Sequence, residues 1–164
     1  MFLVNELFRQ LPFLLVIGSG MTAVLFKSPF WWFCFCGKIV NTIVWVLVTT
    51  ITKRYFPALA KRPQDMHCYF WENGKPTTSS GLPSGHCQSM GFFAMWMLLY
   101  AIQSGFTMVW AIFIGIIGLA SSWFMMYTRV DVYSCHTWLQ AMSGTLLGMI
   151  MTMPLWFIYK RFYT

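Results

Sequence analysis

Long apolar runs constrain the fold of this chain more than any other feature of its sequence. A helix needs about 20 mostly apolar residues to cross a bilayer, and five segments reach or approach that length. They cover residues 11–26, 30–52, 87–102, 106–127 and 137–159. Hydrophobic residues make up 58% of the chain and charged residues 9%, whereas soluble domains carry roughly 25% charged residues. The sequence therefore predicts an all-α, polytopic membrane helix bundle that forms one domain over residues 1–164.

Small residues recur at regular spacing in the last two apolar segments. Such spacing lets two helix backbones approach closely in a membrane, so we interpret these residues as packing positions without a role in chemistry. They are Gly115, Gly118, Gly144 and Gly148.

One long polar stretch, residues 53–86, separates the second and third segments. Its prolines and its cluster of Ser, Thr and Gly are typical of a loop. The aromatic residues at 69–71 suit the lipid headgroup region, and His67 is interpreted as an interfacial residue. The N-terminus lacks the basic residues of a signal peptide, so we expect the first segment to remain in the protein.

Alternating the five segments across the bilayer brings basic residues and two histidines to one membrane face. The second segment ends on the face where the third begins, the fourth returns to that face, and the fifth leaves it. The side chains collected there are Lys53, Arg54, Lys61, Arg62, His86, Arg129 and His136. Lys and Arg are otherwise balanced between the two faces, so the positive-inside rule leaves the orientation open.

The chemistry of this cluster favours a phosphate group. Fixed cations attract an anion, and the planar fork of arginine suits phosphate oxygens. The two histidines add a nucleophile and a proton donor, which phosphate binding alone does not require. The string "PSGH" at the start of a helix adds backbone N–H donors and the positive end of the helix dipole.

Composition argues against several other classes of site. The net charge of +7 is explained by basic loops that meet anionic headgroups or phosphate, so no nucleic-acid partner is expected. The five cysteines lack the spaced pairs of a zinc site. A divalent-metal hydrolase needs several convergent oxygen ligands, so we expect neither a metal nor another cofactor. The acidic residues of the chain are Glu6, Asp65, Glu72 and Asp131.

Three motifs resemble those of the type 2 phosphatidic acid phosphatase (PAP2) superfamily. They read "KRYFPALAKRP", "PSGH" and "TRVDVYSCH", and the middle one is the most specific. The strings "GLPSGHCQSMGFF" and "HTWLQ" are similar to those of the dolichyl-diphosphatase branch. The resemblance implies a metal-independent membrane phosphatase that hydrolyses a polyisoprenyl diphosphate through a phosphohistidine. For a eukaryotic chain it also implies the endoplasmic reticulum membrane, with the site on the lumenal face.

The resemblance implies a role for each matching residue. His136 would attack the phosphorus, and His86 would protonate the leaving oxygen. Gln140 would orient His136, at a position where the superfamily usually has an aspartate. The phosphate oxygens would be held by Lys53, Arg62, Ser84, Gly85 and Arg129.

The first motif departs from the superfamily in its spacing. Arg62 lies two residues farther from Lys53 than the pattern has it. Either Arg54 or Lys61 is therefore an alternative for the role of the lysine.

The third motif departs from the pattern as well. Arg129 and His136 are separated by one extra residue, and one residue turns a helix by about 100°. We therefore expect the segment between them to bulge or to be non-helical if both side chains meet one phosphate.

Asp131 is expected to pair with Arg129 or, alternatively, to act as a histidine partner. Cys87 and Cys135 each adjoin a catalytic candidate, so a disulfide between them becomes geometrically possible in an oxidising compartment.

Other functions fit the same cluster of residues. A broad-specificity lipid phosphate phosphatase would act on phosphatidic acid and related monophosphates. A protein of a different class, a catalytically inactive relative, would bind lipid phosphates as a scaffold. A channel or transporter fits less well, because the charges lie at helix ends and not at the bilayer midplane. The oligomeric state is left open.

Overall fold

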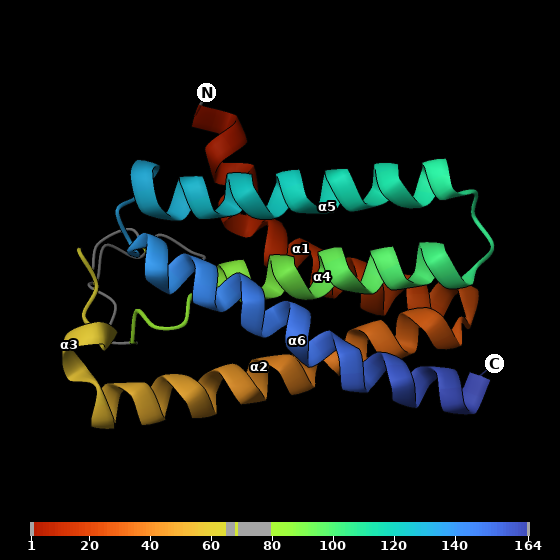
Figure 1. Ribbon diagram of the computed structural model, residues 1–164, viewed down its shortest axis with the longest axis horizontal. Helices are drawn as coiled ribbons and strands as arrows, with labels where there is room; N and C mark the ends of the chain where they lie inside the picture. The colour runs from red at the N-terminus through yellow and green to blue at the C-terminus, as the bar shows by residue number, and fades with distance from the viewer. Residues whose placement is uncertain (1, 65–67, 69–79, 164) are drawn as a thin grey trace.

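The computed structural model in Figure 1 describes residues 2–64, 68 and 80–163. Helices joined by loops make up this part of the chain, and none of its residues is in a strand. The predicted all-α bundle is therefore confirmed for the described residues. The helices are α1 (Phe2–Phe26), α2 (Pro29–Tyr55), α3 (Pro57–Ala60), α4 (Gly85–Gln103), α5 (Met108–Tyr127), the π-helical η1 (Thr128–Val132) and α6 (Trp138–Tyr163).

Among the described helices, four contain a stretch that is long and apolar enough to cross a membrane. These stretches are Arg9–Phe26, Pro29–Tyr55, Met108–Val132 and Trp138–Tyr163. The sequence predicts five, and the exception is α4, which corresponds to the third predicted segment.

The central position of α4 explains this difference. It contacts α1, α2, α5 and α6, and Figure 1 shows it inside the bundle. Polar side chains such as Gln88 and Ser89 lower its hydropathy, but they are buried against neighbouring helices and do not face lipid. With 19 residues, α4 is about 28 Å long, close to the roughly 30 Å of the bilayer core. We conclude that α4 runs through the bundle while the other helices shield it.

Close packing of α6 on α4 sets the distance between the two sides of the candidate site. A side chain on Gly148 would collide with the carbonyl oxygen of Gln88, and one on Gly144 would collide with that of Ser84. The backbone of α6 therefore lies directly on the first turns of α4. The packing role predicted for these two glycines is confirmed.

Two apolar clusters fill the bundle. An aromatic cluster joins α2, α4 and α6, where the rings of Trp96 and Trp156 meet edge to face with centroids 5.1 Å apart. A second cluster lies near the starts of α4 and α6 and the end of α5, and Leu11 and Leu15 of α1 pack against it. The buried members of the second cluster are Cys87, Met90, Met125, Met126 and Ala141.

Candidate active site

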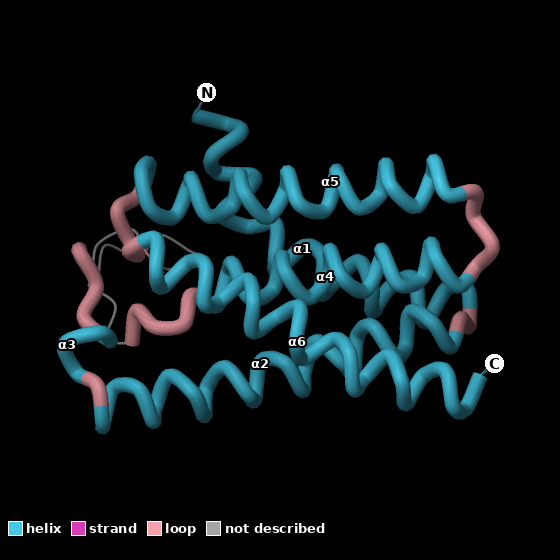
Figure 2. The backbone as a smooth tube through the Cα atoms, in the orientation of Figure 1, coloured by secondary structure: helices cyan, strands magenta, loops and turns pink. Residues whose placement is uncertain are grey.

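Loops from three distant parts of the sequence meet at one end of the bundle. Figure 2 shows the loops that follow α3, precede α4 and precede α6 at this end. The backbone N–H of Gly81 donates to the carbonyl of Ala60 at 2.7 Å, and that of Gln64 donates to the carbonyl of Ser134 at 3.2 Å. These hydrogen bonds hold the three sequence motifs together.

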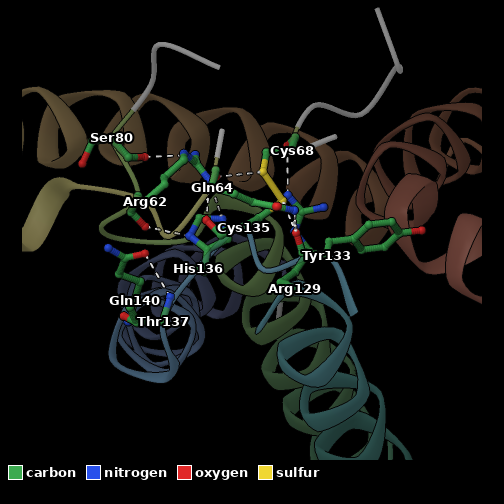
Figure 3. The surroundings of a disulfide bond; sticks show 11 residues. Arg62, Gln64, Cys68, Ser80, Arg129, Tyr133, Cys135, His136, Thr137 and Gln140 are labelled. Atoms are coloured by element: carbon green, nitrogen blue, oxygen red, sulfur yellow. Dashed lines mark hydrogen bonds between the residues drawn. A yellow bond between two sulfur atoms is a disulfide. The ribbon is translucent and has the colours of Figure 1, made fainter. Parts of the chain in front are cut away.

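His136 is engaged at both ring nitrogens (Figure 3). Its Nδ1 lies 2.9 Å from the carbonyl oxygen of Gly81, and its Nε2 lies 2.9 Å from Nη1 of Arg62. A carbonyl oxygen only accepts hydrogen bonds, so Nδ1 carries the proton. A guanidinium only donates, so Nε2 presents its lone pair. The geometry therefore assigns a neutral imidazole whose Nε2 is the basic and nucleophilic atom.

The surroundings of His136 favour this neutral form. Its side chain is 2% exposed. Burial, followed by the positive charges of Arg62 and Arg129, lowers the pKa of His136 well below the usual histidine value. The Gly81 carbonyl and the neighbouring Gln140 side chain oppose this effect in part. His136 is consequently unprotonated at neutral pH in the ligand-free protein.

Arg62 is fixed by the loops around it. Its Nη1 also donates to the carbonyl of Cys135 at 3.1 Å, and its Nη2 donates to the carbonyl of Ser80 at 3.0 Å. The short helix α3 accommodates the longer first motif, because it turns the chain after α2 and delivers Arg62 to His136.

Gln140 supports the partners of His136. Its Nε2 donates to the carbonyls of Leu59 and Lys61, both at 2.8 Å, and its Oε1 accepts the backbone N–H of Thr137 at 3.1 Å. A Cβ atom on Gly81 would lie 2.7 Å from Oε1 of Gln140. The hydrogen bond from Nδ1 of His136 thus goes to the Gly81 carbonyl, and Gln140 holds the loops on either side of it.

The segment between Arg129 and His136 has the bulge that the sequence predicts. Residues Thr128–Val132 form the π-helical η1, and the chain then leaves the helix through Ser134, whose φ is 50°. The carbonyl of Arg129 accepts the N–H of Cys135 at 2.9 Å and that of His136 at 3.2 Å. These two bonds bring the backbone of the histidine back to the arginine, which a regular helix would not do.

The guanidinium of Arg129 is completely buried. Its Nη2 donates to the carbonyl of Cys68 at 2.9 Å. Its Nε and Nη1 have no hydrogen-bond partner among the residues that the structure describes. A buried charge with unsatisfied donors is costly unless an anion or water completes it. Arg129 is therefore well suited to hold phosphate oxygens.

A disulfide joins Cys68 to Cys135, the residue before His136 (Figure 3). The pairing that the sequence left possible, between Cys87 and Cys135, does not form, since Cys87 is a buried free thiol. The disulfide ties the carbonyl that binds Arg129 to the chain that carries His136.

The start of α4 supplies the other side of the site. Ser84 is buried and extended, and its N–H donates to the carbonyl of Gln140 at 3.0 Å. Gly85 lies against the indole of Trp45, where a Cβ atom would be 2.9 Å from Cε2. His86 follows and is buried; Arg129, His136 and Arg62 are the charged groups that act on it most strongly. The first N–H groups of α4 have no acceptor within the helix. They lie at the end of the bundle where the three loops meet.

Some predicted residues are not brought to the histidines. Lys53 lies in the last turn of α2 with an exposed side chain. Arg54 is exposed beside the Tyr55 ring. Lys61 is exposed, and its backbone carbonyl accepts a hydrogen bond from Gln140.

Asp131 is exposed and does not pair with Arg129, whose described bond goes to Cys68, so the expected ion pair is wrong. The positions of His67 and of residues 69–71 lie outside the described residues.

One cation near the histidines escaped the sequence reasoning. Arg9 of α1 is 6% exposed, its backbone is hydrogen-bonded to the imidazole of His86, and its charge acts on Arg129. The available signal was an arginine next to a membrane-spanning segment, a residue that is rarely idle when it is buried.

Comparison with known proteins gives one clear result. Curated proteins and solved structures return no match. Residues 29–163 match the PAP2 superfamily. The match covers most of the chain and all three motifs, so this protein belongs to the PAP2 superfamily, whose members are phosphatases.

Proposed function

We propose that this phosphatase hydrolyses a polyisoprenyl diphosphate of the dolichyl type through a phosphohistidine on His136, without a metal. The observation that carries the proposal is the tautomer of His136. A neutral imidazole with its Nε2 lone pair facing a guanidinium is a nucleophile placed where an anion binds.

Substrate binding would release the nucleophile. In the ligand-free site Arg62 donates to Nε2 of His136, which occupies its lone pair. A phosphate oxygen is a stronger acceptor for guanidinium than an imidazole nitrogen. The bound phosphate therefore draws Arg62 to its oxygens and frees Nε2. Arg129 would use its Nε and Nη1 donors on the same group, together with the N–H groups at the start of α4.

The first chemical step forms a bond between Nε2 of His136 and the terminal phosphorus. The bond from that phosphorus to the leaving oxygen breaks, and His86, protonated when the anionic substrate binds, gives its proton to the leaving oxygen. The carbonyl of Gly81 accepts the Nδ1–H throughout and stabilises the charge on the phosphorylated ring. The arginines stabilise the charge on the equatorial oxygens.

The second step returns the enzyme to its starting state. His86, now neutral, takes a proton from a water molecule that attacks the phosphorus. The Nε2–phosphorus bond breaks, inorganic phosphate leaves, and His86 releases the proton to solvent. The same histidine thus acts first as acid and then as base.

The disulfide supports an extracytoplasmic site. Disulfides persist in oxidising compartments, such as the endoplasmic reticulum lumen or the bacterial periplasm, and are rare in the cytosol. Cys68–Cys135 lies within the site itself. For a eukaryotic chain we propose the endoplasmic reticulum membrane, with the site on its lumenal face.

The decisive experiment measures phosphate release from farnesyl diphosphate by the purified protein in EDTA. A substrate labelled in the terminal phosphate should leave an acid-labile, base-stable label on the protein after rapid quenching. The His136→Ala variant should lose the label and at least about a thousandfold in turnover, with an unchanged thermal unfolding midpoint. Activity that requires Mg²⁺ would contradict the mechanism. Faster turnover of phosphatidic acid would instead favour a broad lipid phosphate phosphatase, and binding without turnover would favour an inactive scaffold.

A further inference from the structure

Arg9 lies in the first part of α1, shortly before Pro12. Pro12 is inside α1 and is fully buried, and a proline within a helix removes a backbone hydrogen bond and kinks it. Figure 1 shows the first turns of α1 directed away from the rest of the helix. Leu11 packs against the cluster formed by Cys87 and Met90 of α4 and their neighbours. This contact holds the first half of α1 next to the start of α4.

The environment of Arg9 is unusual for a cation in a membrane protein. Its side chain is 6% exposed, and its charge is close enough to repel the Arg129 guanidinium, which is 0% exposed. α1 contacts the π-helical η1 that carries Arg129, and two buried like charges repel each other because the low-dielectric interior screens them poorly. An anion between them would convert the repulsion into attraction. Their proximity therefore indicates an anionic ligand that reaches both guanidinium groups.

Arg9 is on the leaving-group side of the site. Arg62 contacts Nε2 of His136, the nucleophile. The backbone of Arg9 is hydrogen-bonded to His86, the proposed proton donor to the leaving oxygen. Arg62 is thus the arginine that meets the nucleophile, and Arg9 is the one whose backbone meets the proposed proton donor. A single phosphoryl group on His136 would be held by Arg62 and Arg129, which leaves Arg9 beside whatever group departs.

We propose that Arg9 binds the inner phosphate of a diphosphate substrate and so makes the enzyme prefer diphosphates to monophosphates. This inference rests on the proposed function. When the terminal phosphorus bonds to His136, the bond to the bridging oxygen breaks and a prenyl monophosphate departs. Arg9 stabilises the charge that develops on that inner phosphate. A prenyl monophosphate substrate has no inner phosphate, so it gains nothing from Arg9.

The test compares farnesyl diphosphate and farnesyl monophosphate as substrates of the full-length protein. Arg9→Gln should lower kcat/KM for the diphosphate by about tenfold or more, the size expected for a lost charge-assisted hydrogen bond, while kcat/KM for the monophosphate changes little. Arg9→Lys should lie between, because lysine keeps the charge and loses the planar fork. Arg161→Gln, an exposed arginine at the other end of the bundle, is the matched control and should behave as wild type. Equal losses on both substrates, or no loss on either, would overturn the proposal.

A binding measurement makes the test independent of turnover. Methylene diphosphonate, which cannot be cleaved, should raise the thermal unfolding midpoint of wild type more than inorganic phosphate does. Arg9→Gln should remove most of that difference, and Arg9→Lys should reduce it if the glutamine variant does not fold. If wild type cleaves neither prenyl substrate but shows this difference, the proposed function fails and the role of Arg9 stands. If the difference is unchanged by both variants, Arg9 does not contact the inner phosphate.

Discussion

The hydrogen bonds of His136 determine the pH range in which it can act. Nε2 attacks only when it is unprotonated, and burial beside two arginines lowers the pKa of His136 well below the usual histidine value. The neutral fraction is therefore complete at neutral pH and is lost as the pH falls through that lowered pKa. We expect the acidic limb of kcat/KM, which reports the free enzyme, to have its midpoint below pH 6.5.

Two measurements assign this limb to His136. Aryl phosphates whose own second pKa values differ should give the same midpoint if the enzyme group controls it. Arg62→Gln should move the midpoint to higher pH, because Arg62 supplies the largest charge effect on His136. A midpoint that shifts with the second pKa of the aryl phosphate would show that another group controls the acidic limb. A midpoint that is unchanged in Arg62→Gln would show the same.

The role of His86 is tested by the leaving group. An alkyl phosphate needs a proton on its departing oxygen, whereas a nitrophenolate departs without one. We expect His86→Ala to lower kcat/KM, which includes phosphorylation but not the later hydrolysis of the phosphohistidine, by about a hundredfold or more for a prenyl phosphate and by much less for p-nitrophenyl phosphate. Burst kinetics would show phosphorylation as the slowed step for the prenyl substrate. Equal losses on the two substrates would remove His86 from the role of general acid.

At the scale of helices, the π-helical η1 shows what spacing alone can predict. The extra residue between Arg129 and His136 cannot fit on one face of a regular helix, so a bulge follows from geometry without any knowledge of the fold. Small residues on α6 similarly indicate a close neighbour, and that neighbour is α4. Hydropathy is less informative for α4 itself, because a helix surrounded by other helices need not be apolar.

The contact between α4 and α6 gives a prediction about stability. A methyl group at Gly148 would collide with the carbonyl of Gln88, which belongs to a helix backbone and cannot move alone. We expect Gly148→Ala to lower the free energy of unfolding by about 1–3 kcal/mol, despite the better helix propensity of alanine. Gly115→Ala is the matched control, because its Cβ would lie 3.5 Å from Cδ1 of Leu98, an ordinary contact. Thermal unfolding in detergent measures both, and equal midpoints would show that α6 can shift on α4.

At the scale of the whole molecule, contacts between distant parts of the chain determine features that local sequence patterns do not predict. The carbonyl that orients His136 belongs to Gly81, 55 positions away, and a backbone oxygen has no signature in the sequence. Cys135 pairs with Cys68 and not with Cys87, because both Cys87 and its neighbours are packed into the cluster beneath the site. Alternation across the bilayer correctly gathered the motifs at one end of the bundle, and Lys53 lies at that end as well, in the last turn of α2, with an exposed side chain. Long-range contacts decide these points.

Orientation in the membrane is a property of the whole chain and supplies the final prediction. The disulfide favours an oxidising environment at the end of the bundle that holds the site. Figure 1 places the C-terminus at the opposite end, where Lys160 and Arg161 lie in the last turn of α6. Basic residues next to a membrane helix favour the cytoplasmic face. Lys53 and Arg54 in the last turn of α2 balance this pair at the other end, so the disulfide alone favours an orientation, with the site outside the cytosol and the C-terminus within it.

In a eukaryotic host, a glycosylation acceptor inserted between Lys75 and Ser79 should carry glycan, and a tag after Thr164 should react with antibody once the plasma membrane alone is permeabilised. An acceptor added after Thr164 is the matched control and should stay unmodified. Non-reducing electrophoresis of wild type and Cys68→Ser, after thiol alkylation, should show one bridge that the variant lacks. An unmodified loop combined with a glycosylated C-terminus would place the site in the cytosol. That result would exclude the disulfide under native conditions and direct the search for substrate to the cytosolic leaflet.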